Sequence, residues 1–219
     1  MNVELEPTEL ESFVYCPFTV GIDTREQRPY QFLGLRANTD KKHARLAIRT
    51  ERVNLKTGFG DYTILELPKI AIERKSKEDL YSSIGQRREN FEERLVRMGG
   101  GPGSWYAAVV IEAEISELVA EPPAHTKLNP KSLMRTILAW QMRYPTVAWW
   151  FLPNRSAAEA WTFRLLERFW NVYEDRVEDL RAVEDGGRVV IGDPQALQEA
   201  MQEVIPPKAK AQANPTLFA

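Results

Sequence analysis

Residues 60–75 read GDYTILELPKIAIERK, two apolar runs joined by the short connection at residues 67–69. Two apolar runs with such a tight connection between them are typical of a β-hairpin. Side chains alternate across a strand, so Glu73 and Lys75 should project from one face of the sheet and Arg74 from the other. The stretch therefore predicts a hairpin whose second strand ends in charged residues.

Two carboxylates flank this hairpin, because Asp61 opens the first strand and Glu73 closes the second. Hard divalent cations such as Mg²⁺ prefer carboxylate oxygens and retain waters, one of which can act as the nucleophile. Lys75 would orient that water or neutralise charge that develops on a phosphate. An isolated Glu-Arg-Lys run is more often a solvated surface, but its place at the end of an apolar strand favours a site. We expect metal-assisted phosphodiester hydrolysis with Mg²⁺, and with Mn²⁺ as a substitute.

The composition limits the class of protein. The 219 residues are 43% hydrophobic and 27% charged, which suits one ordinary globular domain with a short appendage. No apolar run approaches the ~20 residues of a membrane-spanning helix, so we expect no membrane attachment. The single cysteine, Cys16, rules out an internal disulfide and a cysteine-ligated iron–sulfur cluster.

The net charge of −2 hides an uneven distribution. Residues 20–100 contain 17 Lys and Arg against 12 Asp and Glu, a net of +5, which leaves −7 for the other residues. Neutralisation of phosphates supplies most of the nonspecific affinity for nucleic acid. Basic surroundings of an acidic pocket therefore favour DNA as the partner, although a mixed solvated surface would give the same count.

Strand and helix patterns alternate on both sides of the hairpin. We expect an irregular leader or a short helix over residues 1–18, and strands at 20–23 and 45–55. Ser76 should be the N-cap of a helix that continues to the glycines at 99–101. Further strands at 105–111 and 147–152 alternate with helices at 131–143 and 156–176. This order predicts an α/β fold with a mixed central β-sheet flanked by α-helices. If the strand at 20–23 continues in extended form, Asp23 and Arg25 share a face, and Asp23 can join the pocket.

Three motifs follow one another along the chain: Asp23-Thr24-Arg25-Glu26, Gly60-Asp61-Tyr62 and Glu73-Arg74-Lys75-Ser76-Lys77-Glu78-Asp79. Together they resemble the signature of the XPF-type nuclease domain found in the XPF/MUS structure-specific endonucleases. The likeness runs from about residue 20 to residue 171. It implies a restriction-endonuclease-like core over residues 19–183. The implied activity is metal-dependent cleavage of DNA at flaps, forks or other branches, in repair, recombination or replication.

The resemblance assigns catalytic roles to seven residues, which are the four carboxylates and the lysine described next, and Arg25 and Arg74. Asp61 and Glu73 would be the central metal ligands, and Asp23 would help to position the metal or a water. Lys75 would be the catalytic lysine. Asp79 would complete the acidic pocket, with a carboxylate in the first turn of a helix as its structural alternative.

Five basic residues receive roles in phosphate or DNA contact. Arg25 and Arg74 would stabilise the site or contact phosphate, or would form ion pairs that hold the carboxylates in place. Arg88 would face the scissile strand, and Arg87 and Lys77 would bind DNA beside it. Around Arg88 the family usually has a preceding glycine and a glutamine four residues later. This chain has Arg87 and Glu92 there, which leaves the DNA contacts of the helix open.

The resemblance also raises questions of partners and of activity. Members of the family commonly carry a helix-hairpin-helix module that grips branched DNA. We expect none in residues 184–219, so branch selectivity stays open. We expect a homodimer. The main alternative is a noncatalytic, nuclease-like subunit that binds DNA or a partner, although the complete set of motif carboxylates favours an enzyme. A third reading is cleavage at a defined DNA sequence.

The last segment, residues 184–219, reads as a short helix followed by a flexible tail. Residues 212–218 resemble the Gln/Leu/Phe peptides that dock on replication sliding clamps, so a clamp is a further candidate partner. The expected compartment is the cytoplasm, in association with the nucleoid, if the source is prokaryotic or viral, and the nucleus if it is eukaryotic.

Overall fold

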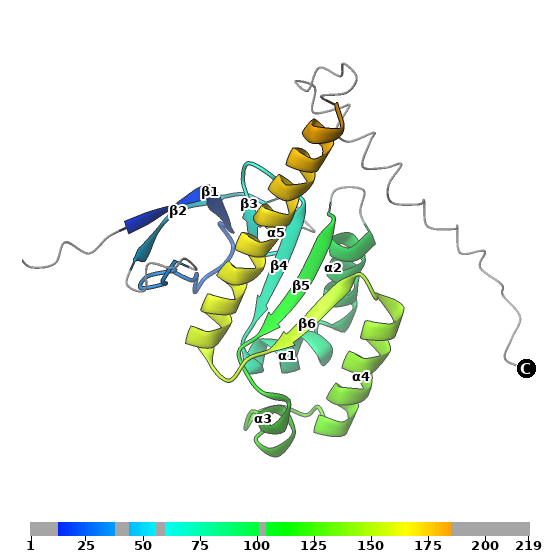
Figure 1. The fold of residues 1–219 in the computed structure, drawn as a ribbon. Helices are drawn as coiled ribbons and strands as arrows, with labels where there is room; N and C mark the ends of the chain where they lie inside the picture. The colour runs from blue at the N-terminus through cyan, green and yellow to red at the C-terminus, as the bar shows by residue number, and fades with distance from the viewer. Residues whose placement is uncertain (1–12, 38–43, 56–59, 101–103, 185–219) are drawn as a thin grey trace, which may run out of the picture. The chain divides into compact units, whose positions relative to one another are not determined.

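The computed structural model describes residues 13–37, 44–55, 60–100 and 104–184. Their centre is a mixed β-sheet with the strand order β2-β1-β3-β4-β5-β6 (Figure 1). The β1–β2, β4–β5 and β5–β6 pairs are parallel, whereas β3 is antiparallel to both β1 and β4. The strands are β1 (Phe13–Asp23), β2 (Arg45–Val53), β3 (Tyr62–Ile64), β4 (Ile70–Lys75), β5 (Tyr106–Ile111) and β6 (Val147–Phe151).

Helices cover both faces of this sheet (Figure 1). One apolar core joins the sheet to α1, α2 and α4, and the other joins it to the part of α5 before residue 174. This arrangement confirms the predicted α/β class, with a mixed sheet flanked by helices. The helices are α1 (Lys77–Ile84), α2 (Arg88–Gly100), α3 (Ile115–Ala120), α4 (Pro130–Arg143) and α5 (Arg155–Glu184).

The predicted hairpin is confirmed as β3 and β4. Tyr62 lies opposite Ile72, and the Asp61 N–H donates to the Ile72 carbonyl oxygen at 2.7 Å. Every residue of β4 before Lys75 is buried, because parallel β5 covers its other edge and helices pack on both faces. The hairpin therefore forms the middle of the sheet.

The sheet topology brings the ends of several strands to one edge of the sheet. Since β1, β4, β5 and β6 all run in the same direction, their carboxyl ends meet there, and β3, which runs the opposite way, begins there. Asp23 and Lys75 end β1 and β4, Asp61 immediately precedes β3, and Glu112 immediately follows β5. Charged residues that are far apart in sequence are thereby gathered.

The structure corrects the prediction upstream of the hairpin. Strand β1 begins at Phe13, so an irregular leader or a short helix over residues 1–18 is wrong for its last six residues. The register shift between Tyr15 and Thr19 accommodates Pro17, a residue that a regular ladder excludes. The chain also leaves the extended form directly after Asp23 and turns at residues 24–25, so Arg25 does not continue the strand.

The helical region after β4 also differs from its prediction. Ser76 caps α1 as expected, with its hydroxyl accepting from the Asp79 N–H. The single helix predicted from Ser76 is two helices, because α1 ends at Ile84 and the Gly85 N–H closes its last turn on the Tyr81 carbonyl oxygen. The sequence pattern also missed α3 and placed the end of α5 eight residues too early.

The chain divides into two units, residues 1–173 and 174–219. Of the second unit, the structure describes the end of α5, up to Glu184. The predicted short helix, flexible tail and clamp-docking peptide lie outside the described residues. None of the helices in the described part of the chain is long and apolar enough to span a membrane.

Gly60 provides a test of how β3 enters the sheet. Its φ is +68°, and a Cβ there would lie 2.5 Å from the Ile72 carbonyl oxygen. We expect Gly60→Ala to lower the free energy of unfolding, measured by urea denaturation. A left-handed backbone conformation alone costs about 1–2 kcal/mol for a residue with a Cβ, and the loss should be larger than that. The added loss arises because β3 and β4 must separate to admit the methyl group.

Gly34 is the matched control. It has a φ of +75°, and no described atom lies within 4 Å of its hypothetical Cβ. Gly34→Ala should therefore cost the backbone strain alone. Equal losses in the two variants would show that close contact with Ile72 does not constrain the start of β3.

Candidate active site

Glu73 is the innermost charged group at this edge of the sheet. Its side chain is fully buried, and its Oε1 accepts hydrogen bonds from Lys75 Nζ at 2.6 Å and from Arg94 Nη1 at 2.5 Å. Its Oε2 has no hydrogen-bond partner among the described residues. A buried carboxylate oxygen without a partner is costly, so this atom is suited to a ligand.

Asp61 lies near Glu73, directly before the neighbouring strand β3. Its Oδ2 accepts the Arg74 N–H at 2.8 Å, and its own N–H and carbonyl oxygen are tied to β4 and β1. Burial raises the pKa of the Asp61 carboxyl well above its usual range, and the nearby charge of Glu73 raises it further, against the opposing effect of Lys75. The backbone thus holds a second carboxylate where its ionisation is unfavourable.

The pKa of Glu73 shifts in the opposite direction. Burial acts to raise its pKa, but the positive charges of Lys75 and Arg94 and their hydrogen bonds prevail, so the pKa of Glu73 lies below its usual value. The pair therefore combines an ionised Glu73 with an Asp61 that binds a proton more readily. A divalent cation between them would favour ionisation of both.

The oxygen donors present fit such a cation. Mg²⁺ is commonly bound by one or two protein carboxylates and keeps several waters, and Asp61 and Glu73 supply two hard oxygen donors with one oxygen unpartnered. Within the described ranges, no group of three His, Cys, Asp or Glu side chains converges. The geometry thus offers a pair of acidic ligands rather than a triad.

Asp23, predicted to join this pair, is engaged by Arg25. The turn after β1 brings Arg25 back, so that Asp23 accepts its N–H at 2.7 Å, its Nε at 2.8 Å and its Nη2 at 2.9 Å. Burial acts to raise the pKa of Asp23, but these hydrogen bonds lower it overall. Arg25 also donates to the Leu55 carbonyl oxygen. This geometry matches the ion-pair alternative for Arg25.

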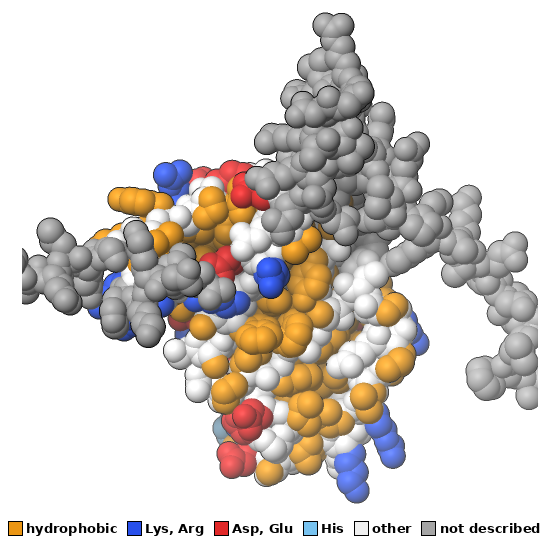
Figure 2. All heavy atoms as spheres, viewed as in Figure 1, with side chains coloured by type: hydrophobic (Ala, Val, Ile, Leu, Met, Phe, Trp, Pro, Cys, Tyr) orange, Lys and Arg blue, Asp and Glu red, His pale blue; other side chains and the backbone are white. Residues whose placement is uncertain are grey.

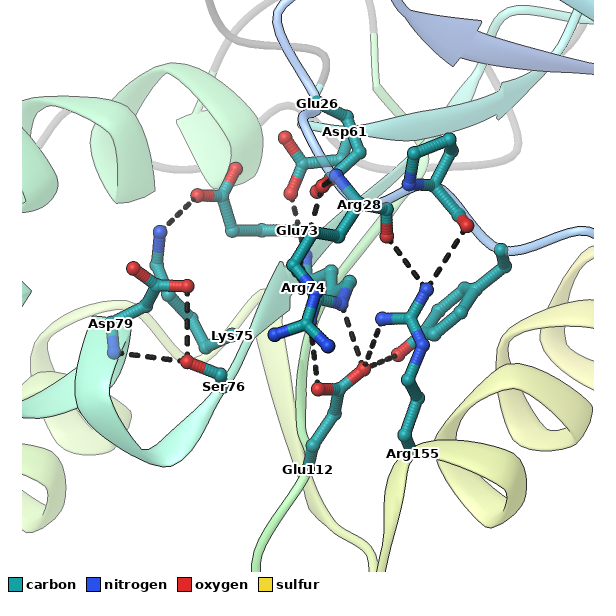
Figure 3. Close-up of polar contacts among 12 residues, drawn as sticks. Glu26, Arg28, Asp61, Glu73, Arg74, Lys75, Ser76, Asp79, Glu112 and Arg155 are labelled. Atoms are coloured by element: carbon teal, nitrogen blue, oxygen red, sulfur yellow. Dashed lines mark hydrogen bonds and ion pairs between the residues drawn. The ribbon is translucent and has the colours of Figure 1, made fainter.

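Asp79 lies in the first turn of α1, next to Lys75 (Figure 3). Its Oδ2 accepts from the Ser76 hydroxyl at 3.1 Å, and its Oδ1 lies 3.8 Å from Arg87 Nη2. Half of the side chain is exposed. The structure thus gives Asp79 the capping contacts of a first-turn carboxylate, beside the pair formed by Asp61 and Glu73.

The residues predicted to bind DNA lie on α1, at the start of α2 and in the turn between the two helices. Lys77 Nζ donates to Glu117 of α3 at 2.6 Å. Arg88 donates to the Thr136 hydroxyl at 2.9 Å, and its guanidinium lies 5.0 Å from the ring centre of Trp140. Both contacts hold these side chains against neighbouring helices, whereas Arg87 is exposed beside them.

Arg74 points away from the acidic pair, as strand alternation requires (Figure 3). Its guanidinium forms a two-point pair with Glu112, with Nε–Oε1 and Nη2–Oε2 distances of 2.7 Å, and lies 3.5 Å from Glu26. Glu112 also accepts from Tyr30 and Arg155 at 3.0 Å. This buried network closes the opposite face of β4, and it matches the ion-pair alternative for Arg74.

Sequence reasoning missed several members of these two clusters. Arg94 lies three residues after Phe91 and four before Met98, both of which are buried, so a cation at helical spacing from apolar residues was an available signal. Glu112 directly follows the apolar strand β5, and Lys75 is the last residue of β4. A charged residue at the end of an apolar strand was therefore a second signal. Arg155 has no such signal, because its contact depends on how α5 packs.

The fold and the site together define a class: an α/β domain of the nuclease type, with a carboxylate pair and a lysine at one edge of a mixed sheet. The family model of the ERCC4 domain matches residues 22–165, which include every residue of both clusters. The chain belongs to this family and carries an XPF-type nuclease domain, so the resemblance inferred from its motifs is confirmed.

Solved structures of XPF from Aeropyrum pernix are similar to this chain. One is 18% identical, with a TM-score of 0.47 over 85% of this chain and 80% of that chain. The other, a complex of that protein with DNA, is also 18% identical, with a TM-score of 0.47 over 85% and 81%. A comparison with curated proteins gave no match.

The opposite pKa shifts of Asp61 and Asp23 predict opposite effects on stability. Because folding raises the pKa of Asp61, the folded protein binds a proton that the unfolded chain releases, and stability falls as the pH rises through that range. In metal-free buffer, we expect Asp61→Asn to raise the free energy of unfolding at pH 7, with a gain that disappears below about pH 4. Denaturant titrations from pH 3 to pH 8 measure it.

Asp23→Asn is the matched control, since it removes the same charge at the end of the adjacent strand. Folding lowers the pKa of Asp23, so its ionised form contributes stability above the unfolded pKa that is lost as the pH falls through the folded one. Asp23→Asn should therefore destabilise the protein at pH 7. Destabilisation by both variants would contradict the raised pKa of Asp61.

Proposed function

We propose that the protein is a metal-dependent DNA endonuclease that cuts at flaps, forks or similar branches, in repair, recombination or replication. The observation that carries this proposal is the buried Asp61–Glu73 pair beside Lys75, with one Glu73 oxygen unpartnered. Membership of the ERCC4-domain family supports a nuclease, and the retained carboxylates support an active one.

Asp61 and Glu73 would hold Mg²⁺, with Mn²⁺ as a substitute. When bound, the ion would lower the pKa of a water and stabilise charge on the phosphate. The chain contributes a rigid arrangement of ligands, because Asp61 is fixed by the Arg74 N–H and Glu73 by Lys75 and Arg94. Fixed ligands of this kind need little reorganisation during the reaction.

Lys75 is the residue best placed to assist the chemistry. Its ammonium donates to Glu73 and lies 4.8 Å from the ring centre of Phe91, and its side chain is largely buried. From this position it would orient the attacking water or neutralise charge on a phosphate oxygen. Arg94 is a positioning residue, since its contact in the site is with Glu73.

Cleavage assays test the activity directly. We expect the protein to cut labelled flap and fork DNA near the branch in Mg²⁺ or Mn²⁺, and to leave plain duplex and single strands largely intact. Asp61→Asn removes a charged ligand and should lower the rate by about 10²-fold or more, a loss comparable to removing one group that stabilises transition-state charge. DNA binding in EDTA should be unchanged.

Glu93→Gln is the control, because Glu93 is an exposed carboxylate paired with Arg97 on α2. Its rate should equal that of the wild type. Binding of branched DNA without cleavage of any substrate would support the noncatalytic alternative. Undiminished cutting by Asp61→Asn would place the chemistry elsewhere.

We also propose that the protein forms a homodimer through the β6 side of the sheet. In the described sheet β6 is one of the two edge strands, and hydrophobic side chains gather on the face shown in Figure 2. The helices that flank β6 expose Leu138 and Met142 on α4 and Trp161 on α5. An apolar surface around an edge strand is suited to a second copy of the same surface.

The mass in solution tests this dimer. We expect light scattering to give twice the chain mass of 25.2 kDa, and we expect Met142→Glu and Trp161→Glu to reduce it to the monomer value. Leu33→Glu is the control, because Leu33 is equally apolar and 77% exposed but lies in the segment after β1. A wild-type monomer at micromolar concentrations would contradict the proposal.

A further inference from the structure

A cavity of about 590 Å³ lies between α1 and the segment that joins α3 to α4. This volume is within the range of sites that bind small ligands. Residues of α1 and the turn after it form one wall, and residues 123–128 form the other. The lining residues that matter for its chemistry are Glu78, Tyr81, Gln86, His125, Lys127 and Leu128.

The lining combines apolar surfaces with groups that form hydrogen bonds. Tyr81 is buried and its hydroxyl donates to the Leu118 carbonyl oxygen, so the accessible apolar part of the lining comes from Pro123, Ala124 and Leu128. Glu78 supplies hydrogen-bond acceptors, and the Gln86 amide both donates and accepts. A planar ring with polar edges, such as a nucleobase, satisfies both kinds of surface.

Basic side chains lie around the same cavity. Lys127 and His125 are exposed at its rim. A second hollow of about 340 Å³, lined by residues 85–90, shares Gly85 and Gln86 with the cavity and adds Arg87 and Arg88. Positive groups on both sides of a base-sized cavity match a base whose two flanking phosphates are negatively charged.

The cavity is also linked to the candidate active site. Glu78 precedes Asp79, whose carboxylate lies near Arg87 and in the same turn as Ser76, the residue after Lys75. The first turn of α1 and the turn after this helix thus connect the candidate active site with one wall of the cavity. A paired base presents its hydrogen-bonding edge to its partner, so the cavity suits a base that is unpaired.

We propose that this cavity binds one unpaired nucleotide of the DNA strand adjoining the cleavage site. The inference rests on the proposed function and adds a means of recognising a branch. Gln86 and Glu78 contact the edge of the base, His125 and Leu128 line its faces, and Lys127 and Arg87 neutralise the phosphates. A duplex end or a nick would leave the cavity empty, whereas a flap or fork would fill it.

Binding without cleavage tests the cavity directly. The full chain with Asp61→Asn would be titrated with a fluorescent flap DNA that carries an abasic residue at successive positions of the single-stranded arm. We expect one position to weaken binding by about tenfold, the loss of one base contact. Gln86→Ala with His125→Ala should cause a similar loss on intact DNA, and little further loss on DNA that is abasic at that position.

Lys127→Ala and its matched control Lys131→Ala complete the test. Lys131 is also exposed, four residues further along, and among the described residues it is outside the cavity lining. Lys127→Ala should weaken binding of the flap more than that of plain duplex, and Lys131→Ala should change both equally little. Equal losses for the two lysines, or independent effects of the abasic residue and the Gln86 and His125 substitutions, would overturn the inference.

The outcome is separable from that of the nuclease proposal. If the wild type cuts flaps but the cavity variants bind and cut as it does, the cavity inference fails and the nuclease stands. If the abasic position and the cavity variants are coupled in binding but the wild type cuts no DNA, the cavity inference stands and the nuclease fails.

Discussion

Strand β4 places opposite charges on two consecutive buried residues, and the surrounding structure is arranged to compensate them. Glu73 and Arg74 project from opposite faces of the sheet, and both are almost completely shielded from water. An unpaired charge in such a position would cost several kcal/mol. Each face must therefore supply a counter-charge, which Lys75 and Arg94 provide for Glu73, and Glu112 provides for Arg74.

The two faces are coupled through the backbone between them. The Arg74 N–H donates to Asp61, so the peptide that carries the structural arginine also fixes the second carboxylate of the candidate active site. Glu112 in turn connects Arg74 to Tyr30 and Arg155, from the segment after β1 and from α5. One face carries the candidate active site and the other carries the Arg74–Glu112 network, and the position of Asp61 depends on both.

Local periodicity made the centre of this arrangement predictable. A period of two put Glu73 and Lys75 together and Arg74 opposite, and the tight connection implied that Asp61 is near Glu73. The counter-charges were less accessible, because Arg94 and Glu112 lie 21 and 38 residues from their partners and meet them through packing of α2 and β5. Strand alternation did not predict the surroundings of Asp23, because the chain turns at residues 24–25 and the Asp23 carboxylate pairs with Arg25. The break between α1 and α2 at Gly85 was also missed, because the apolar pattern continues from one helix into the next.

The hydrogen bond between Lys75 and Glu73 does not prevent the lysine from acting on a substrate. An ammonium group has three donors, and the bond to Glu73 Oε1 uses one of them. Arg94 shares the same oxygen, so Glu73 remains held if Lys75 tilts toward a phosphate. Two cations on Oε1 also keep Glu73 ionised while its Oε2 stays open to a ligand. In the proposed reaction, Arg94 would hold the Glu73 carboxylate in place, and Lys75 would keep donors for the reacting groups.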